Sequence, residues 1–240
     1  MASDWEYRLI YWPDLPGRGE FVRLILEAAQ VPYLDVARRD GIDALFQALE
    51  GGQSGLRPLA PPILRHGQRT LAQLGHIALY LARRHALVPD DEEAQLAANQ
   101  LYLTLVDCLD EVHNAHHPLG KKFYFEEQRE AAKQATRAFL AERLPFYLHY
   151  FEDVLAANSR GHLVGDRLSY VDLGIFQLLA GLRYGFPNAM ERQTTSIPGL
   201  VALAHRVDNH PPIAAYLASP RRIPFNEMGI FRHYPELDGP

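Results

Sequence analysis

A tyrosine and an arginine flank the first loop of the sequence, and both could stabilise an anion. Tyr11 lies near the end of the β-prone run YRLIYW, and Arg18 follows in PGRGE, where a helix is predicted to begin. A phenol at a strand end can donate a short hydrogen bond to an anion, and a helix N-terminus adds partial positive charge. Both effects favour a thiolate over a thiol. The alternatives are core packing for Tyr11 and a solvated or salt-bridged side chain for Arg18.

A cluster of histidines lies further along the chain. The stretch EVHNAHHPLG brings together His113, His116 and His117, which with Asp110 could imitate a metal site. Histidines near a helix C-terminus are also favoured by the helix dipole. We therefore interpret them as structural or pocket residues and predict no metal.

Composition and charge exclude several classes of protein. With 48% hydrophobic and 22% charged residues, the chain is typical of soluble globular proteins. A net charge of −5 and a pI near 6.1 provide no basic face for nucleic acid. No apolar run reaches the ~18 residues of a membrane span, and the N-terminus lacks the pattern of a secretory signal. The single cysteine, Cys108, fits a reducing compartment, and its helical context favours a small buried hydrophobe over a nucleophile. We expect a cytoplasmic protein without nucleic acid or membrane partners.

Strand and helix signals alternate over about the first 85 residues. The order β-α-β-α-β-β-α predicts an α/β layer with a mixed sheet, which forms a domain over 1–85. The strand and helix patterns are YRLIYW, GEFVRLILEAAQ, VPYLDVAR, DGIDALFQALEGG, the hairpin PPILRHGQRTLA and a helix to about His85. Gly67 occupies the first central position of that hairpin, which suits a type II′ turn.

The second half reads as helical, and we predict an all-α domain over 94–240. A long apolar stripe follows a linker rich in acids, and helical patterns also cover 126–158 and three later segments, about 169–183, 197–209 and 211–218. Pro145 should kink or break the first of these patterns, since proline lacks a backbone donor. Ser169 and Asp172 have the spacing of a capping box. The tail, 219–240, is rich in aromatic residues and is expected to dock on the domain.

The motifs of both halves, taken in order, resemble those of the cytosolic glutathione transferases, most closely those with a tyrosine catalyst. They are YRLIYW, GRGE, RLILE, APPIL, LAQ and LSYVDL, and the likeness runs over nearly the whole chain. The resemblance implies a tyrosine-type, bacterial-like member. It also implies a thioredoxin-like first domain, a cytoplasmic homodimer and a role in detoxification.

The resemblance assigns site residues position by position. Tyr11 matches the tyrosine that hydrogen-bonds the sulfur of glutathione and keeps it as a thiolate, and Arg18 matches an arginine near the tripeptide backbone. Pro62 matches the cis-proline of the thioredoxin-like domain, and Gln73 the residue that holds the γ-glutamyl end. Asp110 matches an acid that reaches the γ-glutamyl amine of the other subunit, which would make a homodimer part of the site.

Two positions depart from the family pattern. Leu74 stands where a serine or threonine normally binds the γ-glutamyl carboxylate, so a hydroxyl donor is missing. Losing a hydrogen bond to a charged group costs about 1.5–3 kcal/mol. Pro61 stands where a backbone N–H usually meets the cysteinyl unit, and proline has none. We therefore expect a weakened or shifted glutathione site.

The function implied is that of a glutathione transferase, with glutathione as co-substrate and no metal. The thiolate would attack a small, largely apolar electrophile. Its pocket is expected between the domains, lined by Trp12, Pro13, Asn114, His117 and Phe231. Two alternatives remain open, namely a binding protein of this fold with weak or no catalysis, and a glutathione-dependent isomerase or lyase.

Overall fold

A four-stranded mixed sheet forms the first part of the protein. In a computed structural model, which describes residues 5–51, 56–120 and 122–239, the strand order is β2-β1-β3-β4. β1 pairs parallel with β2 and antiparallel with β3, and β4 completes a hairpin with β3. The strands are β1 (Tyr7–Ile10), β2 (Tyr33–Asp35), β3 (Ile63–His66) and β4 (Arg69–Ala72). Gly67 has φ 56° in the hairpin turn, as the sequence predicts.

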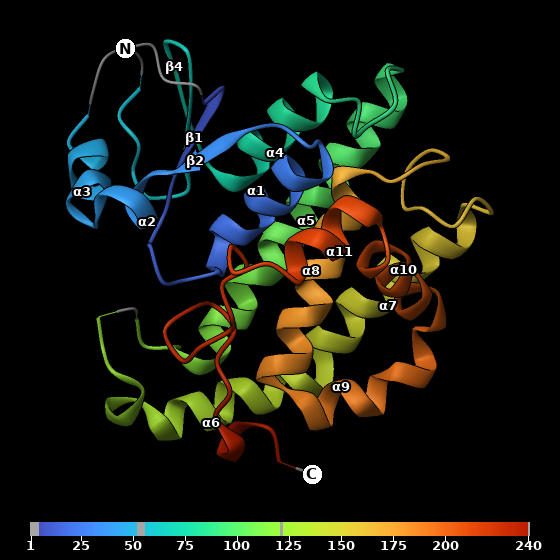
Figure 1. Ribbon diagram of the computed structural model, residues 1–240. Helices are drawn as coiled ribbons and strands as arrows, with labels where there is room; N and C mark the ends of the chain where they lie inside the picture. Colours follow the sequence, from blue (N-terminus) through green and yellow to red (C-terminus); the bar gives the residue numbers. More distant parts are fainter. Residues whose placement is uncertain (1–4, 52–55, 121, 240) are drawn as a thin grey trace.

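The two faces of this sheet are covered by different helices (Figure 1). Tyr7, Leu9 and Leu64 belong to the large core that includes α1 (Gly17–Ala28) and α4 (Leu74–Arg84). Ile10 and Ile63 belong instead to a smaller cluster with α2 (Val36–Asp40) and α3 (Asp43–Leu49). This separation follows from the alternation of side chains along a strand.

The predicted second strand is shorter than expected. VPYLDVAR was expected to be extended throughout, but pairing stops at Asp35 and α2 begins at Val36. The helix ends at Gly41, which has φ 88° and whose N–H donates to the carbonyl of Ala37 over 3.0 Å. A five-residue helix is too short to show helical periodicity in the sequence.

After Ala72, the described residues contain helices and no further strand. The helices are α5 (Glu92–His116), α6 (Arg129–Ala138), α7 (Leu144–Ala157), α8 (Tyr170–Gly185), α9 (Pro187–Gln193), α10 (Pro198–Asp208) and α11 (Pro211–Leu217). Short 3₁₀ helices occupy Phe125–Glu127, Thr194–Ser196 and Pro235–Leu237. None of the described helices combines the length and the apolar character needed to cross a membrane. The elements fit the predicted βαβαββα and all-α parts, while the domain boundaries at 1–85 and 94–240 stay a prediction.

The interruption predicted at Pro145 is confirmed. The segment Phe139–Arg143 is a π-helix between α6 and α7, and Pro145 lies in the first turn of α7. A proline lacks the N–H that would bond to the carbonyl four residues earlier, here that of Ala141. The regular helical pattern is therefore broken just ahead of it.

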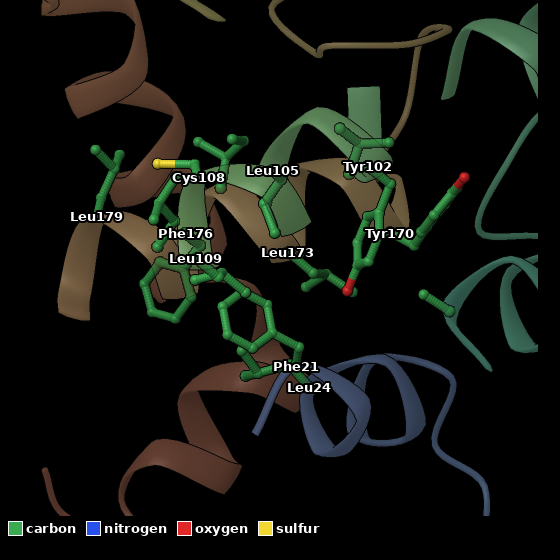
Figure 2. Packing of buried hydrophobic residues seen from close by; sticks show 14 of the residues in the cluster. Phe21, Leu24, Tyr102, Leu105, Cys108, Leu109, Tyr170, Leu173, Phe176 and Leu179 are labelled. Atoms are coloured by element: carbon green, nitrogen blue, oxygen red, sulfur yellow. The ribbon is translucent and has the colours of Figure 1, made fainter. Parts of the chain in front are cut away.

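The helical core lies where α5 and α8 pack together. Figure 2 shows Leu105, Cys108 and Leu109 of α5 beside Phe176 of α8, with Phe21 of α1 reaching the same cluster. Cys108 is fully buried, and burial raises the pKa of its thiol. It packs as the small hydrophobe that the sequence predicts.

The capping box predicted at the start of α8 is confirmed. The backbone N–H of Ser169 donates to Asp172 Oδ2 over 2.8 Å, and the N–H of Asp172 donates to Ser169 Oγ over 3.3 Å. Asp172 also accepts from the N–H of Leu163 over 2.9 Å. The pair therefore fixes both the helix start and the loop before it.

A buried charge network joins α1 to the C-terminal part of the chain. Arg23 is fully buried and lies 3.0 Å from Glu20 Oε2 and 2.8 Å from Asp35 Oδ2. Glu20 also accepts from the hydroxyl of Tyr216 at 2.5 Å and is paired with Arg222 of the tail. The tail (red in Figure 1), which runs from α11 towards α6, is thus docked on the protein as expected.

Candidate active site

A cleft of about 560 Å³ opens beside the carboxyl end of β1. Six segments line it, namely the loop after β1, the start of α1, the prolines before β3, the start of α4, the C-terminal half of α5 and part of the tail. The sequence-predicted residues brought together here are Tyr11, Trp12, Arg18, Pro61, Pro62, Gln73, Leu74 and Asp110. Tyr11 and Asp110, which are 99 positions apart in the sequence, therefore line the same cleft.

The Tyr11 hydroxyl lies at the N-terminal turn of α1. It accepts a hydrogen bond from the backbone N–H of Arg18 over 2.9 Å. Burial raises the pKa of Tyr11, with the Arg18 N–H opposing that shift. The phenol is therefore protonated at neutral pH. Since its oxygen accepts from Arg18, its own hydrogen is left to donate to a ligand in the cleft.

Two glycines make room for this tyrosine. A Cβ on Gly19 would lie 2.6 Å from Cγ of the Tyr11 ring, and a Cβ on Gly17 would collide with its hydroxyl. Gly17 also has φ 37°, a conformation that favours glycine. The motif GRG is visible in the sequence, but the spacing of its two glycines does not show that both make room for the Tyr11 side chain.

Arg18 and Asp110 form an ion pair across the cleft. Arg18 Nη2 lies 2.6 Å from Asp110 Oδ1, which joins the start of α1 to the C-terminal half of α5. The resemblance implies that Asp110 also reaches the other subunit, and this stays a prediction.

The remaining predicted glutathione residues also line the cleft. The bond between Pro61 and Pro62 is cis, and Gln73 has φ 72° and ψ 123° just before α4. Leu74, the first residue of α4, is 1% exposed and belongs to the main core. The side chain of Gln73 does not cap the helix, so the amides of its first turn face the site without a side-chain acceptor from that residue.

Several predicted pocket residues lie elsewhere. Pro13 is not among the residues that line the cleft. Asn114 and His117 line a separate groove of about 490 Å³ near Arg143. Phe231 is 2% exposed and packs on Gly181 of α8, whose missing side chain leaves space for the ring. Of the second-substrate residues predicted, only Trp12 reaches the cleft.

Other residues take their place. Leu15, Leu59, His113 and the tail segment Met228–Ile230 complete the lining. His113 and Asn114 stand three and four positions after Asp110, so helical spacing places both on its side of α5. The structure distinguishes them, because His113 lines the cleft and Asn114 lines the groove. The tail residues gave no comparable signal.

The histidines at the end of α5 contact one another. The rings of His113 and His116 have centroids 5.0 Å apart, and those of His116 and His117 are 4.7 Å apart. Among the described residues, no group of three or more histidine, cysteine or acidic side chains is arranged to hold a metal ion.

Comparisons with known proteins find similarity to one family. The family model "Glutathione S-transferase, C-terminal domain" matches residues 113–220. Glutathione S-transferase of Plasmodium yoelii yoelii is 29% identical over 204 residues, covering 85% of this chain and 89% of that protein. Glutathione S-transferase of Plasmodium falciparum (isolate 3D7) is 27% identical over 220 residues, covering 88% and 95%.

Solved structures show the same fold. The Pi-class glutathione S-transferase of Onchocerca volvulus superposes with a TM-score of 0.68 at 21% identity, covering 88% of this chain and 92% of that one. Prostaglandin synthase D of Nilaparvata lugens gives a TM-score of 0.66 at 22% identity, covering 91% and 99%. A thioredoxin-like part followed by a helical part is therefore the architecture of this chain. None of these comparisons tests the bacterial-like subtype.

Proposed function

We propose that the chain is a glutathione transferase that holds glutathione as a thiolate and directs it onto a small, largely apolar electrophile. One observation carries the proposal. The protonated Tyr11 hydroxyl lies in the cleft at the N-terminal turn of α1, with its oxygen already bonded to the Arg18 N–H.

The chemistry follows from the protonation state of Tyr11. Because burial raises the pKa of its phenol, the group donates a hydrogen bond at neutral pH. A donor aimed at sulfur stabilises the anion more than the thiol, and so lowers the pKa of the bound thiol. A shift of about two pKa units corresponds to ~2.7 kcal/mol, which one charge-assisted bond and a helix terminus together can supply.

The other end of the cleft suits a tripeptide. We propose that Gln73 and the first-turn amides of α4 hold the γ-glutamyl end, that the carbonyl of Pro61 faces the cysteinyl unit, and that the Arg18–Asp110 pair borders the backbone. Leu74 contributes no hydroxyl. The affinity for glutathione is therefore expected to be lower than a complete set of donors would give.

The electrophile would occupy the apolar side of the same cleft. Trp12, Leu15, Met228 and Ile230 are apolar residues of the lining and are assigned to this side. This composition favours an apolar body. The thiolate forms a carbon–sulfur bond, and with an aryl halide the carbon–halogen bond breaks and halide leaves with the bonding electron pair. Holding both reactants in one cleft removes much of the entropic cost of this step. We further propose a cytoplasmic homodimer with a role in detoxification, as is typical of the family.

A second function is supported by particular residues. Leu74 is buried at the start of α4, and Pro61 offers no N–H, so two polar contacts expected in the family are missing. The rival proposal is therefore a binding protein of this fold that takes up apolar ligands with weak or no catalysis.

Binding and turnover distinguish the two proposals. Calorimetry with glutathione, together with conjugation of a generic aryl halide, should show saturable binding and turnover. The ultraviolet absorbance of the bound thiolate should be present in the wild type, lost in Tyr11→Phe and kept in Tyr124→Phe, a matched change at an exposed tyrosine. Absent binding and turnover in the wild type would favour the rival.

A further inference from the structure

The tail segment that lines the cleft is folded back on itself by one arginine. Arg232 Nε donates to the carbonyl of Gly229 over 2.8 Å, and Nη2 donates to that of Met228 over 3.3 Å. The third nitrogen, Nη1, lies 3.3 Å from Nε2 of His117 at the end of α5. Among the described residues, the backbone of 223–233 forms a turn at 227–228 but pairs with no helix or strand. Side chains therefore hold this segment in place.

A second connection returns from α5 to the same segment. His117 Nδ1 lies 2.5 Å from His116 Nδ1, and His116 Nε2 lies 2.7 Å from the carbonyl of Ile230. The contacts form a chain from Arg232 through His117 and His116 to Ile230. Its two ends are two residues apart in the tail, on either side of Phe231.

The chemistry of the partners fixes every proton in this chain. A guanidinium only donates, so His117 Nε2 must accept from Arg232. A neutral His117 then carries its hydrogen on Nδ1 and donates it to His116 Nδ1. A neutral His116 carries its hydrogen on Nε2 and donates it to the Ile230 carbonyl, which only accepts. A proton added to either ring would place two donors face to face.

The surroundings keep both rings neutral. His116 is 0% exposed and His117 is 4% exposed. Burial, the first cause, lowers the pKa of His116 to about 2 and that of His117 to about 4. Arg232 and the neighbouring histidines act in the same direction on His116. At neutral pH the chain of donors and acceptors is therefore complete.

We propose that His116, His117 and Arg232 are positioning residues that fix Met228–Ile230 as the apolar wall of the cleft and thereby determine which electrophile fits. The inference rests on the proposed function for its consequence, because Met228 and Ile230 lie on the side assigned to the electrophile. None of the three positioning residues lines the cleft itself. They act through the wall, Met228–Ile230. Replacing them should therefore impair the reaction of bulky apolar electrophiles more than the binding of glutathione.

A first experiment needs no catalysis. Hydrogen exchange followed by mass spectrometry is compared for the wild type, His117→Phe, Arg232→Lys and the control His149→Phe, which alters an exposed histidine of α7. The peptides that cover 226–233 should exchange faster in His117→Phe and Arg232→Lys than in the wild type. Their exchange should be unchanged in the control His149→Phe. Unchanged exchange in both Arg232→Lys and His117→Phe would overturn the proposal. Arg232 is only half-buried, so its variant is expected to fold.

A second experiment measures selectivity. In both variants kcat/KM for a bulky apolar aryl halide should fall by about tenfold, the effect of one lost hydrogen bond of ordinary strength, while KM for glutathione stays within about twofold. The double variant should lose no more than either single variant, because both break one chain. The proposal would be contradicted if the losses of the two single variants multiplied in the double variant. It would also be contradicted if KM for glutathione changed as much as kcat/KM for the aryl halide. If the wild type neither binds nor conjugates glutathione, the proposed function fails, while the exchange experiment still decides whether the tail is positioned in this way.

Discussion

The ring of Tyr11 covers Gly19 so closely that a Cβ at position 19 would lie 2.6 Å from its Cγ atom. Gly19→Ala must therefore push the ring away from the N-terminal turn of α1 and lengthen the 2.9 Å contact between its hydroxyl and the Arg18 N–H. We expect kcat for conjugation to fall by roughly tenfold or more, the effect of weakening one charge-assisted bond. Steady-state kinetics test this, with Gly239→Ala as control, since a Cβ there meets nothing within 4 Å and Gly239 does not line the cleft.

Removing the Tyr11 hydroxyl should change the pH dependence of the rate. Without the donor, the pKa of the bound thiol rises towards its ordinary value of ~8.5, so less thiolate is present at neutral pH. Tyr11→Phe is expected to lose about tenfold to a hundredfold in rate near pH 7 and to recover part of it at high pH. A pH–rate profile that matches the wild type would count against Tyr11 as the donor.

Replacing Leu74 by serine should have two opposing effects. The hydroxyl restores a donor at the start of α4, so affinity for glutathione is expected to rise by roughly tenfold. The same change removes a core side chain that is 1% exposed, and the free energy of unfolding should fall by about 2–5 kcal/mol. Leu74→Ala separates the effects because it loses the packing without gaining the hydroxyl. Equal affinity in the serine and alanine variants would show that the hydroxyl does not reach the ligand.

The neutral histidines predict how stability depends on pH. The folded protein holds the pKa of His116 at about 2 and that of His117 at about 4, whereas both are near 6.5 in the unfolded chain. The unfolded state therefore binds more protons below pH ~6.5, and the free energy of unfolding falls as the pH drops from there towards 4. Each histidine contributes a slope of up to ~1.4 kcal/mol per pH unit. Urea titrations should show a smaller slope in His117→Phe and the wild-type slope in His149→Phe.

The buried pairs of Arg23 should be far more important for stability than pairs on the surface. Arg23→Ala leaves Glu20 and Asp35 without their guanidinium partner, and we expect a loss of about 3–5 kcal/mol. Arg39→Ala removes an exposed pair with Asp40 and should cost far less, because solvent screens the attraction between exposed charges. Equal losses in the two variants would show that burial does not govern these ion pairs.

Much of the fold could be predicted because its signals are local. The strand, loop and helix around Tyr11, the hairpin at Gly67, the capping box of Ser169 and the break at Pro145 each depend on residues close together in the sequence. The short helices α2 and α9 were missed for the opposite reason. Five and seven residues contain too few turns to establish a helical period, and β-prone residues precede α2.

The two sides of the cleft differed in how far they could be predicted. Tyr11, Arg18, Pro62 and Gln73 stand at the ends of elements whose order fixes where those ends meet. The electrophile side depends on the rotation of α5 and on where the tail docks. A shift of one position along a helix turns a side chain by about 100°, enough to separate His113 from Asn114. Nothing in the tail sequence shows that Phe231 packs against Gly181.

The buried network of α1 has a consequence for how the protein is made. Glu20 takes as partners Tyr216 and Arg222, which follow it by 196 and 202 positions. A ribosome adding ~5–20 residues each second needs about 10–40 s to cover that distance. Throughout this interval the nascent first half holds a carboxylate that lacks two of its final contacts. Its native packing is thus completed only by segments synthesised late, which leaves a period during translation when a chaperone could bind it.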